Sequence, residues 1–321
     1  FGFAQQRGLS MHVLILGGTG FVGRHVAAAL MREGHEISVV SRSAGRGGNG
    51  PRRVVWNGWD GAALAGLLDG IDAIINLQGE NIGGGRWTDE RKQAIVNSRV
   101  ETGRALCVAL RMRREQGQTL PATLLQASAS GYYGLWQESA PPCDEEAPSG
   151  KGFLADTCRQ WEHSTVPVEA LGVRRCVLRF APVLGKKADG TPGGFIERML
   201  PPFRMHVGGP LGSGRQPLCW THLDDIAGVA SMLLQRTDLA GAFNICAPRT
   251  PTMSEFTRTL GKVCGSPAWM PVPAFVLRLM LGQMADELLL AGQNPKPLRL
   301  QAAGYAFRQP ELEPALRSVL S

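Results

Sequence analysis

Residues 11–32 read MHVLILGGTGFVGRHVAAALMR: an apolar run, a turn with four glycines, and a helix-forming stretch. This order of strand, glycine turn and helix is what a dinucleotide-binding unit requires. The glycines allow a sharp turn, close approach of the backbone to a pyrophosphate, and tight packing of the helix on the strand. Free N–H groups at the start of the helix can bind phosphates, helped by the helix dipole. The stretch therefore predicts a nucleotide site at Gly17–Gly23.

The composition is that of a globular protein with a large core. The chain has 321 residues, of which 44% are hydrophobic and 19% charged, and its 41 glycines fit a turn-rich α/β enzyme. The net charge of +7 comes from scattered arginines. The tightest group, Arg111, Arg113 and Arg114, stands at the end of an expected helix, where cations favour the dipole. We expect that group to be solvated and predict no nucleic-acid partner.

The seven cysteines and six histidines show no C-x-x-C pair and no metal-ligand spacing. We therefore predict no metal site, and free thiols in a reducing compartment, the cytoplasm. No apolar run approaches the ~18 residues of a membrane span, so no membrane partner is expected. Phe1–Ser10 precede Met11 without a basic start or an apolar core, and we expect them to be leader residues or an addition to the native chain.

Strand-like and helical patterns alternate after the first unit. The expected strands are 36–40, 53–56, 73–77, 122–127, 173–180 and 242–245, and the clearest helices are 89–113 and 153–170. This alternation predicts an α/β fold, a doubly wound parallel sheet of the Rossmann type. We assign the dinucleotide-binding Rossmann domain to 11–182, with 220–246 completing the sheet. A smaller C-terminal, substrate-binding lobe covers 183–321, with a helical extension from about 252.

The end of the second strand selects the dinucleotide. It reads Val40-Ser41-Arg42-Ser43, without an acidic residue. An NAD site has an acid about 20 positions after the glycines, whereas a 2′-phosphate needs a cation there. Arg42 can fork onto a phosphate, Ser41 can add a hydroxyl, and Arg24 offers a second cation. The sequence predicts NADP(H); the competing interpretation of Arg42 is a solvated loop arginine.

Several motifs resemble, in the same order, those of the extended short-chain dehydrogenase/reductases, which include sugar-nucleotide epimerases and dehydratases. They are the glycine motif, Asn76–Gly79, Ser128–Gly134 and Leu178–Gly185. Three others resemble a divergent epimerase-like subgroup that has its own helical C-terminal extension: Gly79–Ile82, Ser98–Thr102 and Gly208–Gly214. The resemblance runs from Met11 to the last residues.

The resemblance implies a set of cofactor contacts. The pyrophosphate would be held by Gly17, Thr19, Gly20, Phe21 and Val22, and the 2′-phosphate by Ser41 and Arg42. Leu77 and Gln78 would border the ribose, Arg99 would point toward the cofactor, and Val183 would line the nicotinamide side. Gln78 departs from the small residue that is usual in the subgroup. The alternative for Arg99 is an ordinary helix-surface arginine.

The residues for hydride chemistry depart from the family pattern. The family uses a Ser or Thr with Tyr-x-x-x-Lys, in which the lysine lowers the pKa of the tyrosine. Ser128 stands where the serine belongs. With Glu162 as the register mark, Leu154 takes the tyrosine position and Cys158 the lysine position. A slip of one residue gives Phe153 and Thr157 instead. In either register both chemical groups are missing.

Other residues offer weaker candidates. Tyr132 and Tyr133 follow the fifth strand, and one of them, with Tyr132 preferred, could replace the missing acid; packing or substrate stacking is the alternative. Cys158 precedes Arg159, but we expect a buried cysteine rather than a reactive one. Asp224 is expected to cap the next helix. Residues 144–146 are expected to form a solvated acidic loop.

Two functions follow from these residues. The first is an NADP(H)-dependent oxidoreductase or epimerase-like enzyme with an unknown small substrate, polyhydroxylated or carbonyl-bearing, and with proton transfer by a nonstandard group or water. The alternative is an NADP(H)-binding protein with little or no turnover, acting as a sensor or as a partner-binding subunit. A homodimer is compatible with either function.

Overall fold

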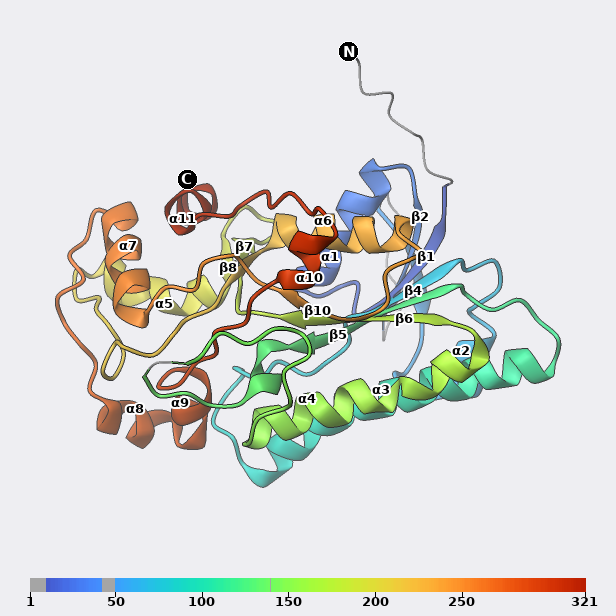
Figure 1. Cartoon of the computed structure of the whole chain (residues 1–321), viewed down its shortest axis with the longest axis horizontal. Helices are drawn as coiled ribbons and strands as arrows, with labels where there is room; N and C mark the ends of the chain where they lie inside the picture. Colours follow the sequence, from blue (N-terminus) through green and yellow to red (C-terminus); the bar gives the residue numbers. More distant parts are fainter. Residues whose placement is uncertain (1–9, 42–49, 139) are drawn as a thin grey trace, which may run out of the picture.

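The computed structural model describes residues 10–41, 50–138 and 140–321. Its centre is a seven-stranded sheet in the order β10-β6-β5-β4-β1-β2-β3, and every neighbouring pair is parallel (Figure 1). The strands are β1 (His12–Leu16), β2 (Glu36–Ser41), β3 (Arg52–Val55), β4 (Ala73–Asn76), β5 (Thr123–Ala129), β6 (Arg174–Phe180) and β10 (Gly241–Ile245). The predicted Rossmann fold is confirmed.

Helices cover both faces of this sheet. Figure 1 places α1 (Phe21–Arg32), α6 (Leu223–Gln235) and α10 (Leu298–Ala302) on one side. On the other side lie α2 (Gly61–Ala65), α3 (Asp89–Glu115) and α4 (Phe153–Ser164). The short 3-10 helix η1 (Ser130–Tyr133) contacts α4, and η2 (Val166–Leu171) contacts α3. The carboxyl ends of the strands face the C-terminal lobe, and ligand sites of such sheets lie at that edge.

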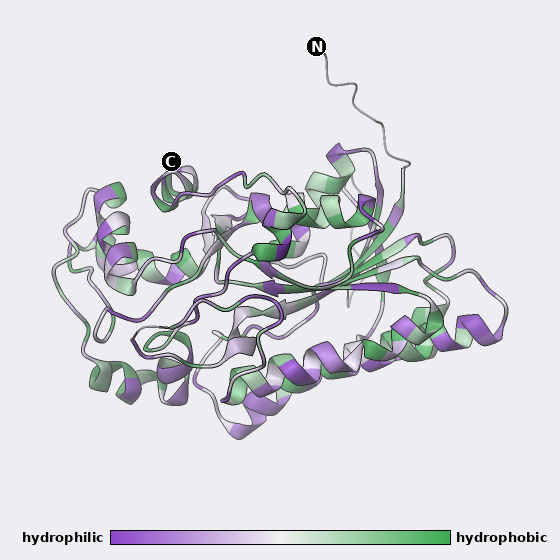
Figure 2. Ribbon diagram, viewed as in Figure 1, coloured by the Kyte–Doolittle hydropathy of each residue, from purple (hydrophilic) through white to green (hydrophobic). Residues whose placement is uncertain are grey.

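Strand β1 explains why the first apolar run is continuous. Val13 and Ile15 pack with α1 and α6, whereas Leu14 and Leu16 pack with α2 and α3. Successive side chains of a strand point to opposite faces, so a strand covered on both sides must be apolar throughout. Figure 2 shows the hydrophobic residues gathered along the strands and the inner helix faces. Each buried leucine or isoleucine side chain contributes roughly 1.5–3 kcal/mol.

The C-terminal lobe has its own small sheet and core. Its strands β7 (Val183–Lys186), β8 (Pro192–Gly194) and β9 (Thr221–His222) are ordered β8-β7-β9. Its helices are α5 (Phe195–Arg204), α7 (Met253–Cys264), α8 (Ala274–Leu281), α9 (Gln283–Leu288) and α11 (Leu312–Leu320). Phe203, Trp220 and Phe256 are fully buried between α5, α7 and α11. A capping box of Thr252 and Glu255 starts α7.

Two local predictions about helices were wrong. The expected helix 153–170 ends at Ser164, and residues 166–171 form η2 instead. Pro167 is the cause, because proline lacks an N–H and its ring clashes with the carbonyl four residues earlier in a helix. Helix α6 is capped by His222 rather than by Asp224: the ring Nδ1 accepts from the Asp224 N–H at 3.2 Å.

Two charged side chains from groups that were expected in solvent are buried. Glu145 in the acidic loop is only 5% exposed. Arg113, expected among solvated cations, is 3% exposed and donates to the carbonyls of Ala65 and Thr119 and to Asp69. Buried charges need such partners, and the sequence pattern alone did not show them.

Some predictions fall beyond what the structure describes. Residues 1–9 of the expected leader and Arg42 lie outside the described residues. Within the described ranges, no helix is long and apolar enough to cross a membrane. Within the same ranges, no group of three or more His, Cys, Asp or Glu side chains could hold a metal ion.

Candidate functional site

The glycine loop packs too closely for side chains at two of its glycines. Gly17 has φ +75°, a conformation that L side chains rarely adopt, and a Cβ there would lie 2.8 Å from the carbonyl oxygen of Leu77. A Cβ on Gly23 would collide with the carbonyl oxygen of Gly17. The loop therefore lies directly against the end of β4, and α1 lies directly against the loop.

The start of α1 is open to an anion. Its N-cap, Gly20, makes no side-chain capping bond, and the first turn contains no acidic residue. Arg24 donates from Nε to the carbonyl of Thr19 at 2.6 Å, which fixes the loop from outside. Uncapped N–H groups and the positive end of the helix dipole together favour a phosphate at this position.

The residues expected beside the ribose lie on the same edge. Leu77 donates its N–H to Leu16 at 2.9 Å, so the end of β4 stays paired with β1 beside the glycine loop. The N–H of Gln78 binds Asn76 Oδ1 at 3.2 Å. The side-chain amide of Gln78 turns toward Gly58, where a Cβ would lie 2.6 Å from its Nε2. Leu77 and Gln78 are thus brought together with Gly17.

Arg99 is not an ordinary surface arginine. Its guanidinium donates to the carbonyls of Ile95 at 2.9 Å and Glu80 at 3.1 Å and lies 4.9 Å from the ring of Trp161. Burial lowers the pKa of Arg99, and the nearby Cys158 and Glu80 oppose that shift. The side chain reaches the loop that follows Leu77 and Gln78. Its direct contact with a cofactor stays a prediction.

Phe21 connects the glycine loop to the C-terminal lobe. Its ring lies so close to Gly193 and Gly194 that a Cβ on Gly194 would be 2.8 Å from it. Val183, which was expected on the nicotinamide side, packs in the same hydrophobic cluster as Phe21. The lobe therefore meets the Rossmann unit at the start of α1.

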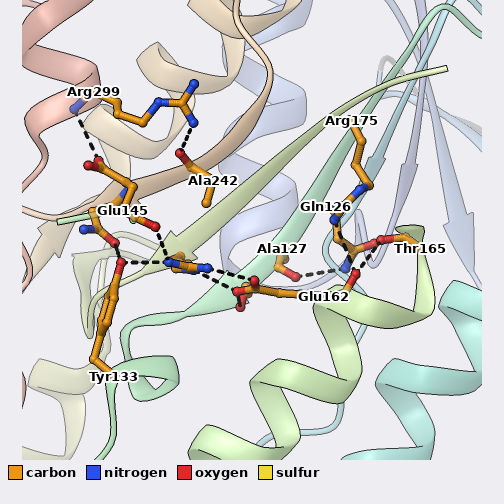
Figure 3. Close-up of polar contacts among 12 residues, drawn as sticks. Gln126, Ala127, Tyr133, Glu145, Glu162, Thr165, Arg175, Ala242 and Arg299 are labelled. Carbon is orange, nitrogen blue, oxygen red and sulfur yellow. Dashed lines mark hydrogen bonds and ion pairs between the residues drawn. The ribbon is translucent and has the colours of Figure 1, made fainter. Parts of the chain in front are cut away.

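Ser128 is tied to a buried ion pair. Its hydroxyl donates to Glu162 Oε1 at 2.6 Å. Arg179 binds the same carboxylate at both oxygens, with Nε–Oε1 at 2.9 Å and Nη2–Oε2 at 3.0 Å. The exposed fractions of the two side chains are 5% for Arg179 and 14% for Glu162. Figure 3 shows Glu162 reaching from α4 toward the strands.

The ion pair continues into a polar network. Arg179 Nη1 donates to the Tyr133 hydroxyl at 2.9 Å, and that hydroxyl donates to Asn244 Oδ1 at 2.7 Å. The backbone N–H of Asn244 donates to Glu145 Oε1 at 3.1 Å. Burial raises the pKa of both Tyr133 and Glu145. The network joins α4, η1, β6 and β10 beneath the edge where the cofactor is expected.

The preferred catalytic tyrosine stacks on this network. Arg179 lies 3.6 Å from the centre of the Tyr132 ring, which is a cation–π contact. Tyr132 is half-buried, whereas Tyr133 is buried. The catalytic roles of Ser128 and Tyr132 stay predictions.

The family's tyrosine and lysine positions are filled by buried groups. Leu154 and Cys158 are 8% and 4% exposed, and both face Gly131 in η1. Burial raises the pKa of Cys158 to about 11, and the Glu162 carboxylate adds to the shift. The expected burial of Cys158 is confirmed, and its lack of reactivity stays a prediction. Leu154 has no proton to exchange, and the raised pKa keeps the Cys158 thiol neutral at neutral pH.

The C-terminal extension contributes two polar side chains that the sequence did not point to. Glu287 accepts from the N–H groups of Phe153 and Leu154 at 3.1 and 2.8 Å, so it caps the first turn of α4. Gln293 binds the Ser130 hydroxyl at 3.2 Å and the Gly134 carbonyl at 2.9 Å. Both lie in a helical, loop-rich tail that carries no recognisable motif.

Glu162 and Arg179 were also missed as functional partners. Arg179 could have been recognised from the sequence, because it is the one charged side chain in the apolar segment Cys176–Phe180. A lone charge in a buried strand requires a partner of opposite sign. Glu162 served only as a register mark for the family pattern, because an acidic residue on a helix does not by itself indicate a buried partner.

Comparison with known proteins agrees with this geometry. Residues 13–246 match the NAD dependent epimerase/dehydratase family. The chain belongs to this family. A second match, to a domain of unknown function called DUF1731, covers residues 272–319, which include α8, α9 and α11.

Individual relatives match along nearly the whole chain. Epimerase family protein YfhF of Bacillus subtilis is 34% identical over 97% of this chain and 98% of its own length. Epimerase family protein SDR39U1 of Homo sapiens is 34% identical over 97% of this chain and all of its own length. A crystal structure of human SDR39U1 (isoform 2) with NADPH has a TM-score of 0.84 at 33% identity and covers 96% of this chain and 99% of that one. The epimerase-like resemblance is confirmed.

Proposed function

We propose that this chain binds NADP(H) at the glycine loop and is an epimerase-like oxidoreductase for a small molecule. The observation that supports this proposal most directly is the start of α1, which has no side-chain cap. The loop before it has no room for side chains at Gly17 and Gly23. The related human protein crystallised with NADPH supports the choice of dinucleotide. So does the sequence at this point, because Ser41 at the end of β2 is followed by Arg42 rather than by an acidic residue.

Each of the predicted residues at the carboxyl ends of the strands has a binding role in this proposal. The N–H groups of Gly20, Phe21 and Val22 hold the pyrophosphate, and Gly17 and Thr19 shape the turn. Leu77 and Gln78 border the ribose, Ser41 and Arg42 take the 2′-phosphate, and Val183 lines the nicotinamide side. Arg99 fixes the loop beyond Gln78 through its bond to the Glu80 carbonyl.

The chemistry must run without the family's tyrosine–lysine pair. When bound, NADP(H) supplies or accepts a hydride. Leu154 and Cys158 cannot move the accompanying proton, because one is apolar and the other stays a neutral thiol. Tyr132, next to the Ser128–Glu162–Arg179 group, or a water molecule would move it instead. Ser128 would then hold Glu162 in place or bind the substrate hydroxyl or carbonyl oxygen.

The second candidate is an NADP(H)-binding protein with little or no turnover, acting as a sensor or a partner-binding subunit. The buried Leu154 and Cys158 favour it, since both proton-transfer groups are replaced by side chains that pack. Both candidates share the same cofactor site. They differ in whether the bound NADP(H) exchanges a hydride with a substrate.

Absorbance at 340 nm separates the candidates. NADPH oxidation is measured with a panel of aldehydes, ketones and sugar nucleotides, using the wild type, Tyr132→Phe and Ser128→Ala. The enzyme proposal expects oxidation with at least one substrate, and a loss of rate in Tyr132→Phe with unchanged NADPH affinity. Tight NADPH binding without oxidation across the panel would favour the second candidate.

We also propose a homodimer in a reducing compartment, the cytoplasm. All seven cysteines are free thiols, and five of them are buried. This fits a compartment that does not form disulfides.

Light scattering after a size-exclusion column measures the oligomeric state. A mass of about 35 kDa, close to the 34.5 kDa of one chain, would contradict the proposed homodimer.

A further inference from the structure

The C-terminal lobe leaves a group of large apolar side chains in solvent. We call this group the apolar strip, and the exposed fractions of its members range from 39% to 77%. The members are Met205 after α5, Trp269 and Met270 before α8, and Phe275, Leu279 and Met280 in α8. Figure 1 places α8 at the lower left edge of the molecule, and Figure 2 shows most of this helix in the green of hydrophobic residues. Single apolar residues are normal on a surface, whereas a large contiguous group marks an interaction site.

Hydrogen bonds bring the two parts of the strip together. Trp269 donates from Nε1 to the carbonyl of His206 at 3.0 Å, so its ring lies beside the end of α5 and Met205. The N–H of Met270 donates to the carbonyl of Gly208 at 3.2 Å. The segment before α8 therefore runs along the segment after α5. Members from two distant parts of the chain thus meet in one place.

The outer side of α8 is as apolar as its inner side. Leu277 faces inward, where it packs with Ala285 and Leu290. Phe275 and Leu279 stand one helical turn apart and share the outer side. A helix that is apolar all round is normally buried, and eight residues are far too few to span a membrane. The exposed side of α8 therefore indicates that another surface covers it.

The charges around the strip favour a protein surface over a membrane. Residues 269–281 contain one charged side chain, Arg278, and it pairs with Asp286 at 2.9 Å. Two further arginines, Arg86 and Arg204, stand at the edges of the strip. The cores of protein interfaces are rich in Trp, Phe and Met and poor in Lys, Asp and Glu. A helix that lies on a membrane instead has a polar face with several Lys or Arg residues, and α8 has no such face.

The area of the strip matches what a stable dimer needs. Large apolar side chains offer roughly 150–250 Å² each, so six of them at these exposed fractions leave roughly 600–900 Å² uncovered. A standard protein interface buries about 800 Å² on each partner. In a two-fold dimer the same patch serves both chains, and a neutral apolar patch faces its own copy without repulsion between like charges.

We propose that the apolar strip is the interface of a two-fold homodimer, with α8 of one protomer packed against the strip of its partner. This inference rests on the homodimer proposed above, for which no surface was named. It also assigns a role to the domain of unknown function matched at residues 272–319, because α8 belongs to that domain.

The test compares Leu279→Lys with Val108→Lys, a change of an exposed valine on α3 outside the strip. Analytical ultracentrifugation over a dilution series measures the dissociation constant of the dimer, and circular dichroism checks that the variants fold. The wild type should reach twice the 34.5 kDa of one chain. Leu279→Lys should raise the dissociation constant at least about 30-fold, because it places a charge in each half of the interface. Phe275→Lys, on the same side of α8, should act alike, and Val108→Lys should stay within about twofold of the wild type.

The outcomes separate this inference from the proposed homodimer. A wild-type dimer that both Leu279→Lys and Phe275→Lys leave unchanged would overturn the inference while the homodimer stands. Dissociation by Val108→Lys alone would place the interface on α3 instead. A wild type that is monomeric at every concentration would overturn both, without touching the NADP(H) proposal. If that monomer sediments with phosphatidylserine vesicles and Leu279→Lys does not, the strip belongs to a membrane surface and the inference is wrong.

Discussion

Glu162 and Arg179 form a two-point ion pair beneath the end of β5, with nitrogen–oxygen distances of 2.9 and 3.0 Å. Burial alone would lower the pKa of Arg179, but the bonds to Glu162 and Tyr133 outweigh it and raise that pKa. The arginine is therefore permanently charged, and it binds the carboxylate that also accepts from Ser128. The serine of the family's catalytic set is thus attached to a structural charge pair.

Breaking this pair should strongly destabilise the fold. Glu162→Gln leaves the Arg179 guanidinium buried beside a neutral amide, and such losses cost about 3–5 kcal/mol. Urea unfolding measures the change. Glu169→Gln is the control, because its pair with Arg175 has a half-exposed carboxylate and should contribute less than about 1 kcal/mol. Equal losses in the two variants would refute the buried role.

The C-terminal extension should stabilise α4 through one carboxylate. Glu287 is 4% exposed and caps the first N–H groups of α4. Glu287→Gln should lower the free energy of unfolding by about 1.5–3 kcal/mol, the value of hydrogen bonds to a charged group. Asp286→Asn, one residue away in an exposed pair with Arg278, should cost less than about 1 kcal/mol. A larger effect of Asp286→Asn would show that the cap is unimportant.

The fold was largely predictable because its signals are local. The continuous apolar run at Val13–Leu16, the glycine turn and the strand–helix alternation each depend on neighbouring residues, and all of them match the sheet. The small sheet β8-β7-β9 was not predicted. Its strands have two to four residues and one reads Pro-Gly-Gly, so no period of two could be seen.

The sequence predicted the residues of the candidate site only where they belong to one continuous motif. The glycine loop and Leu77–Gln78 come from single segments, and the structure brings them together. The partners Glu162 and Glu287 come from α4 and α9, and Gln293 comes from the loop after α9. Only tertiary packing brings these three residues to the site. Glu145 shows the same limit: its acidic neighbours suggested a solvated loop, yet Asn244 and the C-terminal extension bury it.

Cys158 should be inert to thiol reagents in the folded protein. Burial raises its pKa to about 11, so only about one molecule in a thousand carries the thiolate at pH 8. Iodoacetamide labelling read by mass spectrometry should modify the half-buried Cys264 well before Cys158. In urea the two should react at similar rates. Native labelling of Cys158 as fast as Cys264 would instead indicate a reactive thiol in the site.

Asp224 should make stability depend on acid. Its contacts with the rings of His222 and His25 hold its pKa well below the usual range. Because the folded pKa is depressed, the contribution is fully present above the unfolded value of about 3.9 and is lost progressively as pH falls from there toward the folded pKa. The urea midpoint of Asp224→Asn should therefore lie below the wild type at pH 6, and the gap should narrow steadily as pH falls from about 4 to about 2. A gap that does not change with pH would contradict this.

The most direct test of the account is calorimetric titration of the purified protein with NADPH and with NADH. We predict saturable binding of one NADPH per chain, at least tenfold tighter than NADH. Gly23→Ala should abolish it, since the added Cβ collides with Gly17. Gly66→Ala should leave it unchanged, because a Cβ there makes only an ordinary contact, 3.7 Å from the Ala63 carbonyl oxygen. Equal affinity for the two dinucleotides, or unchanged binding in Gly23→Ala, would contradict the NADP(H) site.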